Sequence, residues 1–288
     1  MWRGRSFPRA STVTAMAIWL NGRVLDESEA VVSVFDHGLT VGDGVFETIN
    51  SHHSVPFAMT RHLRRLSRSA AAMGLPAPDQ AVVSTAVSAV LEGTSWPRGR
   101  IRVTLTAGPG PAGSERGKDG LTLLVTSGPQ KPAAASSQVT VVPWTRNERA
   151  ATAGVKSTSY ADNVIALAYA REQGCSEALF ANTQGQLCEG TGANVFVVVD
   201  GRLITPTLES GCLAGITREL VLEWCADATE EDAPVEVLRA AEEVFLVSTV
   251  RDVQPVHACD GVEYPAPGEV TRHVQQLWAE RTAQTQDP

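Results

Sequence analysis

Lysine is rare in this chain, since only three of its 24 basic residues are lysines: Lys118, Lys131 and Lys156. Lys118 stands among charged residues, where water keeps its amine protonated, and Lys131 lies in a Pro/Ala/Ser-rich stretch. Lys156 follows a valine and precedes small hydroxyl residues just before a predicted helix. Partial burial would lower the pKa of Lys156 and free its amine for Schiff-base chemistry. An exposed strand lysine is the alternative reading.

Two other segments of the second half carry residue types suited to chemistry. Glu189 precedes the apolar strand 195–199, and a carboxylate at the entrance to a buried strand needs a partner. Gly215, Ile216 and Thr217 open a predicted helix, whose free N–H groups and positive end suit a phosphate. An ordinary threonine cap is the alternative for that helix start.

Several familiar motifs fail on their context. Residues 108–113 satisfy G-x-G-x-x-G, but a strand follows where a dinucleotide site needs a helix, so we expect a hairpin loop. His52, His53 and His62 lack acidic or Cys partners at metal-ligand spacing, so we interpret them as surface residues and expect no metal. The five cysteines stand singly and indicate buried thiols in a reducing compartment.

Composition excludes several classes of function. The 288 residues are 43% apolar, which suffices for a sizeable core, and no apolar run approaches a membrane span. The net charge of −8 argues against nucleic acid as a partner. Residues 1–15 carry three arginines and no acid, without an apolar targeting segment, and we interpret them as a disordered extension of a cytoplasmic protein.

The elements that must position these residues mix strands and helices without strict alternation, which favours an α+β fold of two lobes. Predicted strands span residues 17–20 and 23–25 around an Asn-Gly turn, 30–36, 45–50, 101–107, 121–127, 138–144, 177–182, 193–206 as a hairpin, and 242–250. Predicted helices span residues 60–74, 81–91, 162–173, 216–225 and 269–282. Residues 16–127 form the expected small N-terminal domain, 128–137 the linker and 138–288 the C-terminal domain.

Taken together, the motifs resemble the class IV pyridoxal-phosphate enzymes of fold type IV, over about residues 17–264. The segments that carry the resemblance are F-D-H-G-L-T-V-G-D-G-V-F-E-T (35–48), H-L-R-R-L-S-R-S-A (62–70), K-S-T-S-Y (156–160), E-G-T-G-A-N-V-F (189–196), G-C-L-A-G-I-T-R (211–218) and E-V-F-L-V-S-T (243–249). The resemblance implies a small N-terminal α/β domain, a larger pseudo-barrel C-terminal domain that binds pyridoxal 5′-phosphate, and a homodimer.

The resemblance also implies a role for each matching residue. Lys156 would form the Schiff base and shuttle protons, and Glu189 would face the pyridine nitrogen. Tyr160 would approach the phenolic oxygen. The residues implied for the phosphate are Arg65, Gly215, Ile216, Thr217, Ser248 and Thr249, whereas Arg61, Arg64 and Arg68 are interpreted as solvated helix positions.

Within this family, the G-D-G-V-F-E-T run most resembles 4-amino-4-deoxychorismate lyases, which release pyruvate and leave 4-aminobenzoate, the folate precursor. A D-amino acid or branched-chain aminotransferase is the alternative. Several lyases carry an arginine and a G-G-R-G-Y-like run where this chain has residues 107–111, and if that arginine binds the substrate carboxylate, another residue must replace it here. Candidates for the substrate side are Thr40, Val41, Phe46, Arg102 and Arg146.

Overall fold

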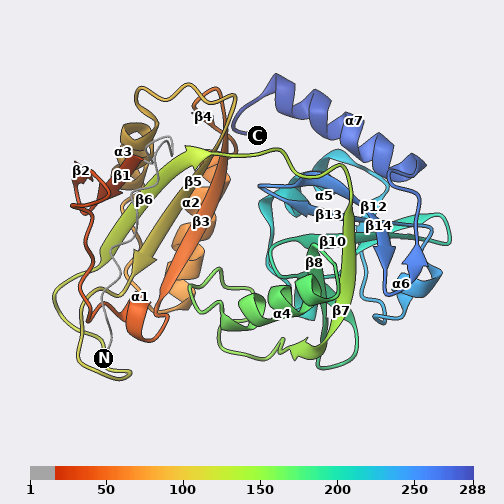
Figure 1. Cartoon of the computed structure of the whole chain (residues 1–288), viewed down its shortest axis with the longest axis horizontal. Coiled ribbons are helices and arrows are strands. Elements are labelled where there is room, and N and C mark those ends of the chain that lie inside the picture. The colour runs from red at the N-terminus through yellow and green to blue at the C-terminus, as the bar shows by residue number, and fades with distance from the viewer. Residues whose placement is uncertain (1–16) are drawn as a thin grey trace.

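The computed structural model describes residues 17–288, and the prediction for residues 1–15 lies outside this range. Figure 1 shows two halves side by side, each built around one β-sheet. Within the described residues the first half contains β1 (Ala17–Leu20), β2 (Arg23–Leu25), α1 (His37–Thr40), β3 (Gly44–His52), β4 (Val55–Pro56), α2 (Met59–Ala72), α3 (Gln80–Leu91), β5 (Arg98–Thr106) and β6 (Thr122–Pro129).

The second half begins with β7 and ends with a long helix. Its described elements are β7 (Ser137–Arg146), α4 (Ala161–Glu172), β8 (Glu177–Asn182), β9 (Leu187–Gly190), β10 (Asn194–Val199), β11 (Arg202–Thr205), a 3-10 turn (Leu208–Ser210), α5 (Ile216–Trp224), β12 (Ala228–Glu230), α6 (Val237–Ala240), β13 (Glu243–Ser248), β14 (Asp252–Cys259), β15 (Val262–Glu263) and α7 (Glu269–Gln284). Most predicted elements are confirmed, with ends shifted by at most three residues.

The sheet of the first half is antiparallel, in the order β2-β1-β6-β5-β3-β4. Alternate residues of β3, such as Val45 and Ile49, are buried with Ile101 and Val103 of β5 beneath α2 and α3. The other face of β3 and β5 carries Phe46, Thr48, Arg100 and Arg102, because successive strand residues point to opposite sides. This second face therefore carries residues expected at the substrate.

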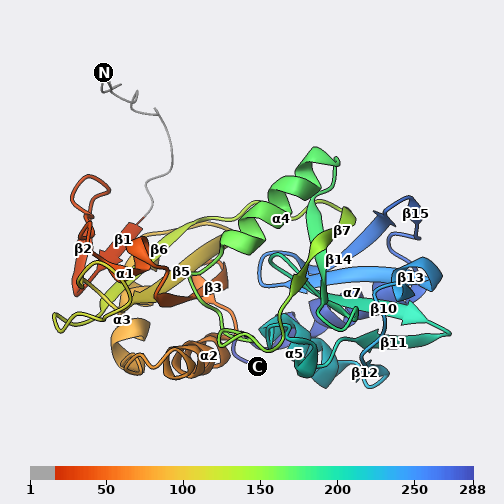
Figure 2. The ribbon, with the colours of Figure 1, turned by 90° about the horizontal axis from the view of Figure 1, so that it is seen from below.

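The sheet of the second half is mixed, in the order β12-β11-β10-β13-β14-β7-β8-β9, with β15 beside β14. Its strand β10 is buried throughout most of its length, which explains the continuous apolar run in the sequence. Helices α5 and α7 pack against one face through Leu220, Val274 and Trp278. Seen from below, α5 lies next to α2 of the first half (Figure 2).

The chain crosses between the two sheets at residues 130–136. The linker predicted over residues 128–137 therefore starts and ends inside strands, since Gly128 and Pro129 pair in β6 and Ser137 pairs in β7. The division into domains at this point stays a prediction.

The predicted strand at residues 30–36 is wrong. Residues 31–35 form no strand, and Asp36 instead caps the short helix α1 by accepting a hydrogen bond from Gly38 N–H at 2.8 Å. This apolar run therefore lies on the surface, with Val31 74% and Phe35 62% exposed. Elsewhere in residues 17–288, no helix combines the length and apolar character that crossing a membrane requires.

Candidate active site

A pocket of about 690 Å³ is lined by residues of both halves. Arg65 comes from α2 of the first half, and the rest of the lining comes from the second half and the segment that precedes α4. All residues expected to bind the cofactor line this one pocket: Arg65, Lys156, Tyr160, Glu189, Gly215, Ile216, Thr217, Ser248 and Thr249. Arg146 lines it as well. Residues separated by up to 184 positions in sequence are thus brought together.

Lys156 is positioned by the open edge of β3. The short strand β4 pairs only with the C-terminal end of β3, so the N-terminal end of β3 is free to pair with residues 156–158. There Phe46 N–H donates to Lys156 O at 2.9 Å, and Thr158 N–H donates to Gly44 O at 2.8 Å. Burial, together with the nearby positive charge of Arg65, lowers the pKa of Lys156 to about 8. Lys118 and Lys131 are exposed. The structure therefore gives Lys156 the environment of a reactive amine.

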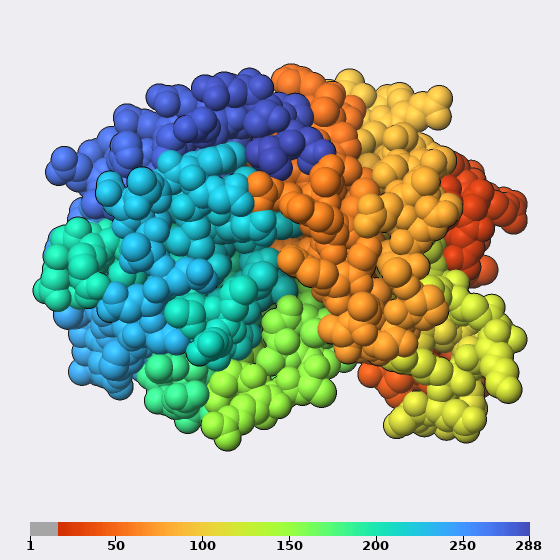
Figure 3. All heavy atoms as spheres, turned by 180° about the vertical axis from the view of Figure 1, so that it is seen from behind, coloured from red at the N-terminus to blue at the C-terminus, as the bar shows by residue number. Residues whose placement is uncertain are grey.

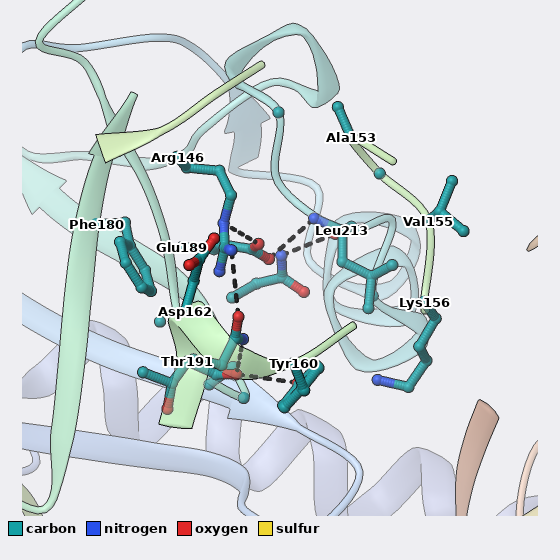
Figure 4. Close-up of a pocket in the computed structure, with 18 of the residues that line it drawn as sticks. Arg146, Ala153, Val155, Lys156, Tyr160, Asp162, Phe180, Glu189, Thr191 and Leu213 are labelled. Carbon is teal, nitrogen blue, oxygen red and sulfur yellow. Dashed lines mark hydrogen bonds and ion pairs between the residues drawn. The ribbon is translucent and has the colours of Figure 1, made fainter. Parts of the chain in front are cut away.

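Glu189 lies across the pocket from Lys156 (Figure 4). Its Oε2 accepts a hydrogen bond from Leu213 N–H at 2.9 Å, and its Oε1 lies 3.2 Å from Arg146 Nε as an ion pair. Burial raises the pKa of Glu189, and the Arg146 charge partly opposes this rise. Arg146 in turn stacks on the Phe180 ring at 4.3 Å and donates to Asn163. Arg146 is thus itself held in place and fixes the position of the Glu189 carboxylate.

Arg65 belongs to a buried network that the sequence reading missed. Both oxygens of Glu47 accept hydrogen bonds from Arg65, at 2.7 Å from Nε and 2.6 Å from Nη2, and His62 Nδ1 lies 2.7 Å from Glu47. Burial acts to raise the pKa of Glu47, but Arg65 and His62 outweigh it and the pKa falls to about 2. A glutamate between the buried positions Val45 and Ile49 was the sequence signal for this network.

The surface position expected for His62 is therefore wrong, because His62 is 1% exposed and faces Glu47. His62 is buried because it lies on the side of α2 that faces the protein interior, next to the buried Leu63. The expectation for Arg61 is wrong as well, since its side chain is 13% exposed and pairs with Glu219 and Glu223 of α5. Arg64 and Arg68 are exposed, as expected.

The N-terminus of α5 closes one end of the pocket. Gly215 precedes the helix without a side-chain cap, and a Cβ there would lie 1.9 Å from Asn194 Oδ1, so only glycine fits. The first N–H groups of a helix have no partner within it. Nearby, Ser248 Oγ is buried and makes no hydrogen bond within the described residues. These unused donors, with Arg65, suit the phosphate of pyridoxal phosphate, so the residues present fit that cofactor.

The side of the site next to the first sheet consists of Phe46 of β3, Arg102 of β5 and Tyr160, which precedes α4. The Phe46 and Tyr160 rings meet edge to face at 5.4 Å, and the Arg102 guanidinium lies 3.8 Å above the Phe46 ring. Tyr160 Oη donates to Thr191 O at 3.0 Å, and burial raises its pKa. Phe46 and Arg102 stand beside the pocket lining and not within it.

Thr40 and Val41 lie farther out. Both are exposed and absent from the pocket lining, and Thr40 Oγ1 donates back to Asp36 O within α1. Two polar residues that the sequence reading did not single out, Asn163 and Thr191, line the pocket and are joined by a hydrogen bond. Thr191 is part of the quoted segment 189–196 and Asn163 follows the segment 156–160 closely, but only the structure shows that both side chains are buried. Residues 17–288 contain no cluster of three His, Cys, Asp or Glu side chains suited to a metal ion.

Comparison with known proteins identifies the family. Residues 44–259 match the family described as amino-transferase class IV, and this span covers most of the chain. The chain therefore belongs to the class IV aminotransferases. Because its relatives include transaminases and an aminodeoxychorismate lyase, it is a pyridoxal-phosphate-dependent enzyme of one of these two kinds.

Three curated relatives illustrate this range. A putative branched-chain-amino-acid aminotransferase of Methanocaldococcus jannaschii is 32% identical, over 91% of this chain and 94% of the relative. A D-alanine aminotransferase of Bacillus licheniformis is 30% identical, over 90% and 95%. An aminodeoxychorismate lyase of Bacillus subtilis is 28% identical, over 91% and 93%.

Solved structures confirm the fold-type IV architecture. A fold IV-transaminase from Curtobacterium pusillum superimposes with a TM-score of 0.83 at 29% identity, covering 92% of this chain and 99% of that chain. A branched-chain aminotransferase from the archaeon Thermoproteus uzoniensis, solved with norvaline, gives a TM-score of 0.82 at 30% identity, covering 92% and 94%. A further branched-chain amino acid aminotransferase, solved with N-(5′-phosphopyridoxyl)-L-glutamate, gives a TM-score of 0.85 at 25% identity, covering 93% and 94%.

Proposed function

We propose that this pocket binds pyridoxal 5′-phosphate and removes the Cα proton of an amino-bearing carboxylate. The convergence of Lys156, Glu189, Arg65 and the α5 N-terminus on one pocket is the observation that carries the proposal. When bound, the cofactor supplies an electron sink for the charge left on Cα. Lys156 is the residue that forms the covalent link and moves the proton, because its lowered pKa makes the free amine available near neutral pH.

The other residues hold the cofactor in place. The phosphate would be held by Arg65, Ser248, Thr249 and the N–H groups of Ile216 and Thr217, which would anchor the cofactor independently of its link to Lys156.

Two further side chains act on the ring. Glu189 would pair with the pyridine nitrogen and favour its protonated form, and the charge of Arg146 favours the ionised form of Glu189. Tyr160, which contacts Phe46, would lie near the phenolic oxygen.

Arg102 is the residue that we propose for the substrate carboxylate. Its side chain projects from the face of β5 opposite α2 and α3, and its guanidinium stacks on the Phe46 ring. The amine of Lys156 also contacts this ring. The charge of Arg102 lowers the pKa of Lys156, so the two groups interact electrostatically. Within the described residues, its guanidinium has a hydrogen bond only to Thr104, at 3.3 Å, whereas Arg146 is engaged by Glu189. Arg102 therefore retains donors for an anion.

The first candidate reaction is that of 4-amino-4-deoxychorismate lyase, in the synthesis of 4-aminobenzoate for folate. After Lys156 takes the Cα proton, the neighbouring C–O bond would break, the ring would become aromatic, and the enolpyruvate that leaves would take up a proton to become pyruvate. The lyase-like run Gly42–Thr48, which includes Phe46, and the 28% identical lyase support it. A D-amino acid or branched-chain transamination is the second candidate, supported by the two relatives of 30% identity or more.

A product assay separates the two reactions. Purified enzyme with 4-amino-4-deoxychorismate and no keto acid should yield pyruvate and 4-aminobenzoate if it is the lyase. If it is a transaminase, that mixture stays inert, and amino acids are consumed only when 2-oxoglutarate or pyruvate is added. A protein that is inactive in both assays and binds no cofactor would refute the whole proposal.

We also propose a homodimer whose partner covers the apolar surface near the pocket. Six large apolar residues between positions 31 and 41 are more than 40% exposed: Val31, Val32, Val34, Phe35, Leu39 and Val41. Trp144 and Ile165, which line the pocket, are 45% and 53% exposed. Exposed apolar side chains that gather in one segment are typical of protein–protein contacts. Light scattering should give twice the 30.6 kDa chain mass, and Phe35→Asp should give monomers; a wild-type monomer would contradict the dimer.

The cytoplasmic location stays a prediction.

A further inference from the structure

Helix α2, which carries Arg65, is attached to the second half of the molecule at its N-terminal end. Phe57, just before α2, is 6% exposed and packs in the core formed by α5 and α7, with its ring 5.8 Å from that of Trp278. This contact joins the first sheet to the core of the second, since Phe57 N–H also donates to Asn50 O of β3. The start of α2 is thus fixed to α5 and α7 before the helix reaches the pocket.

Arg61 makes the next attachment. Its Nη1 and Nη2 each donate to one oxygen of Glu223 at 2.8 Å, and Nη1 also contacts Glu219. Glu219 and Glu223 are four residues apart and so lie on one face of α5. The hydrogen bond to Glu223, together with the negative charges of Glu219 and Glu223, raises the pKa of Arg61. A two-pronged pair of this kind fixes geometry better than a single contact.

The last residues of the chain complete the attachment. Gln286 O accepts from Ala58 N–H at 2.7 Å, Asp287 Oδ1 accepts from Thr60 N–H at 2.9 Å, and Pro288 O accepts from Arg61 Nε at 2.8 Å. Figures 2 and 3 show this segment between α2 and α5 and packed against the α2 surface.

This contact supplies the cap that the sequence of α2 lacks. Ala58 at the N-cap has no side chain able to accept a hydrogen bond, and Asp287 accepts one from the second residue of the helix. The start of α2 is thereby fixed by a segment more than 220 residues away.

The spacing along both helices gives these contacts a consequence at the pocket. Arg65 lies one turn beyond Arg61 on α2, and Ile216 and Thr217 lie one turn before the Glu219–Glu223 face of α5. One turn of each helix forms the ion pairs, and the adjacent turn of each faces the pocket. Arg65 Nη1 already donates to Ala214 O, just before α5, at 2.9 Å.

We propose that Arg61 and the segment 286–288 are positioning residues that set α2 against α5 and so determine how tightly the cofactor phosphate is bound. This inference rests on the proposed cofactor site. Arg61 lies outside the pocket lining and touches no atom of the site, so it acts through the placement of Arg65. Its loss should weaken binding of the phosphate more than binding of the ring.

The test compares pyridoxal phosphate with pyridoxal, which lacks the phosphate. Both ligands are titrated into apoprotein, followed by absorbance, for the wild type, Arg61→Ala, Asp287→Ala and Asp287→Asn. Arg61→Ala and Asp287→Ala should weaken pyridoxal phosphate about tenfold and pyridoxal less than about twofold. Asp287→Asn should stay close to the wild type, because asparagine caps helices equally well. Arg68→Ala, an exposed position on α2, is the matched control and should change neither affinity.

Three outcomes are distinguishable. Selective loss of the phosphate contribution in Arg61→Ala and Asp287→Ala supports the proposal. An unchanged ratio of the two affinities in both variants overturns it, whether both ligands weaken equally or neither does. If the wild type itself shows no preference for the phosphorylated ligand, the proposed function fails before the positioning role is tested.

Discussion

The amine nitrogen of Lys156 lies 4.5 Å from the centre of the Phe46 ring, and the same two residues share a backbone hydrogen bond of 2.9 Å. The ring, buried at 4% exposure, excludes water from one side of the amine. Burial of the amine, followed by the nearby positive charge of Arg65, disfavours the charged form and lowers the pKa of Lys156 to about 8.

The lowered pKa gives a pH dependence for cofactor incorporation. Only the neutral amine attacks an aldehyde, so the rate at which apoprotein takes up pyridoxal phosphate should rise about tenfold per pH unit up to pH 8 and then level off. An ordinary lysine would keep gaining rate up to about pH 10. Absorbance-monitored mixing between pH 6 and 10 measures this, and a rate that still climbs at pH 9.5 would contradict the assignment.

Lys156→Ala should remove both turnover and the visible absorbance of the lysine-bound cofactor. Lys118→Ala and Lys131→Ala are matched controls, since both lysines are exposed and distant from the pocket. Borohydride reduction followed by peptide mapping provides a second measurement. The tag should appear on residue 156, and a tag elsewhere would refute the role of Lys156.

Glu189→Gln should retain the cofactor but reduce turnover by about 100-fold, because a neutral amide no longer keeps the pyridine nitrogen protonated. Cofactor content and the steady-state rate are measured on the same preparation. Rates equal to wild type would contradict the pairing of Glu189 with the ring.

Glu47→Gln should lower the free energy of unfolding by about 3 kcal/mol, because it leaves the buried Arg65 without its counter-charge. The pKa of Glu47 is about 2 when folded and 4.5 in its ordinary state, so its stabilisation is present above pH 4.5 and is lost as the pH falls through 2. Urea unfolding at several pH values checks both statements. A wild type and variant of equal stability at pH 7 would argue against the network.

Arg102→Ala should raise the KM for a carboxylate substrate by about tenfold or more, because a charged hydrogen bond is lost, and should leave cofactor affinity unchanged. Arg100→Ala is the control on the same face of β5. An unchanged KM in Arg102→Ala would direct the search for the carboxylate partner elsewhere.

The elements could be predicted from sequence wherever local pattern decides structure. The turn at Asn21 and Gly22, with positive φ at both positions, forms the expected hairpin. The prediction failed at residues 31–35, because an apolar run alone does not provide a neighbouring strand with a free edge.

By itself, the sequence determined which residue types were available for chemistry: a lysine between a valine and small hydroxyl residues, a glutamate before an apolar strand and a glycine at a helix start. Only the tertiary structure showed that Glu47 binds both Arg65 and His62. It also showed that Arg61 pairs α2 with α5 and that Asp287 caps α2. The reason is physical. Propensity and periodicity act over a few residues, whereas a buried charge is stabilised by whichever partner the folded chain brings within about 3 Å, however distant in sequence.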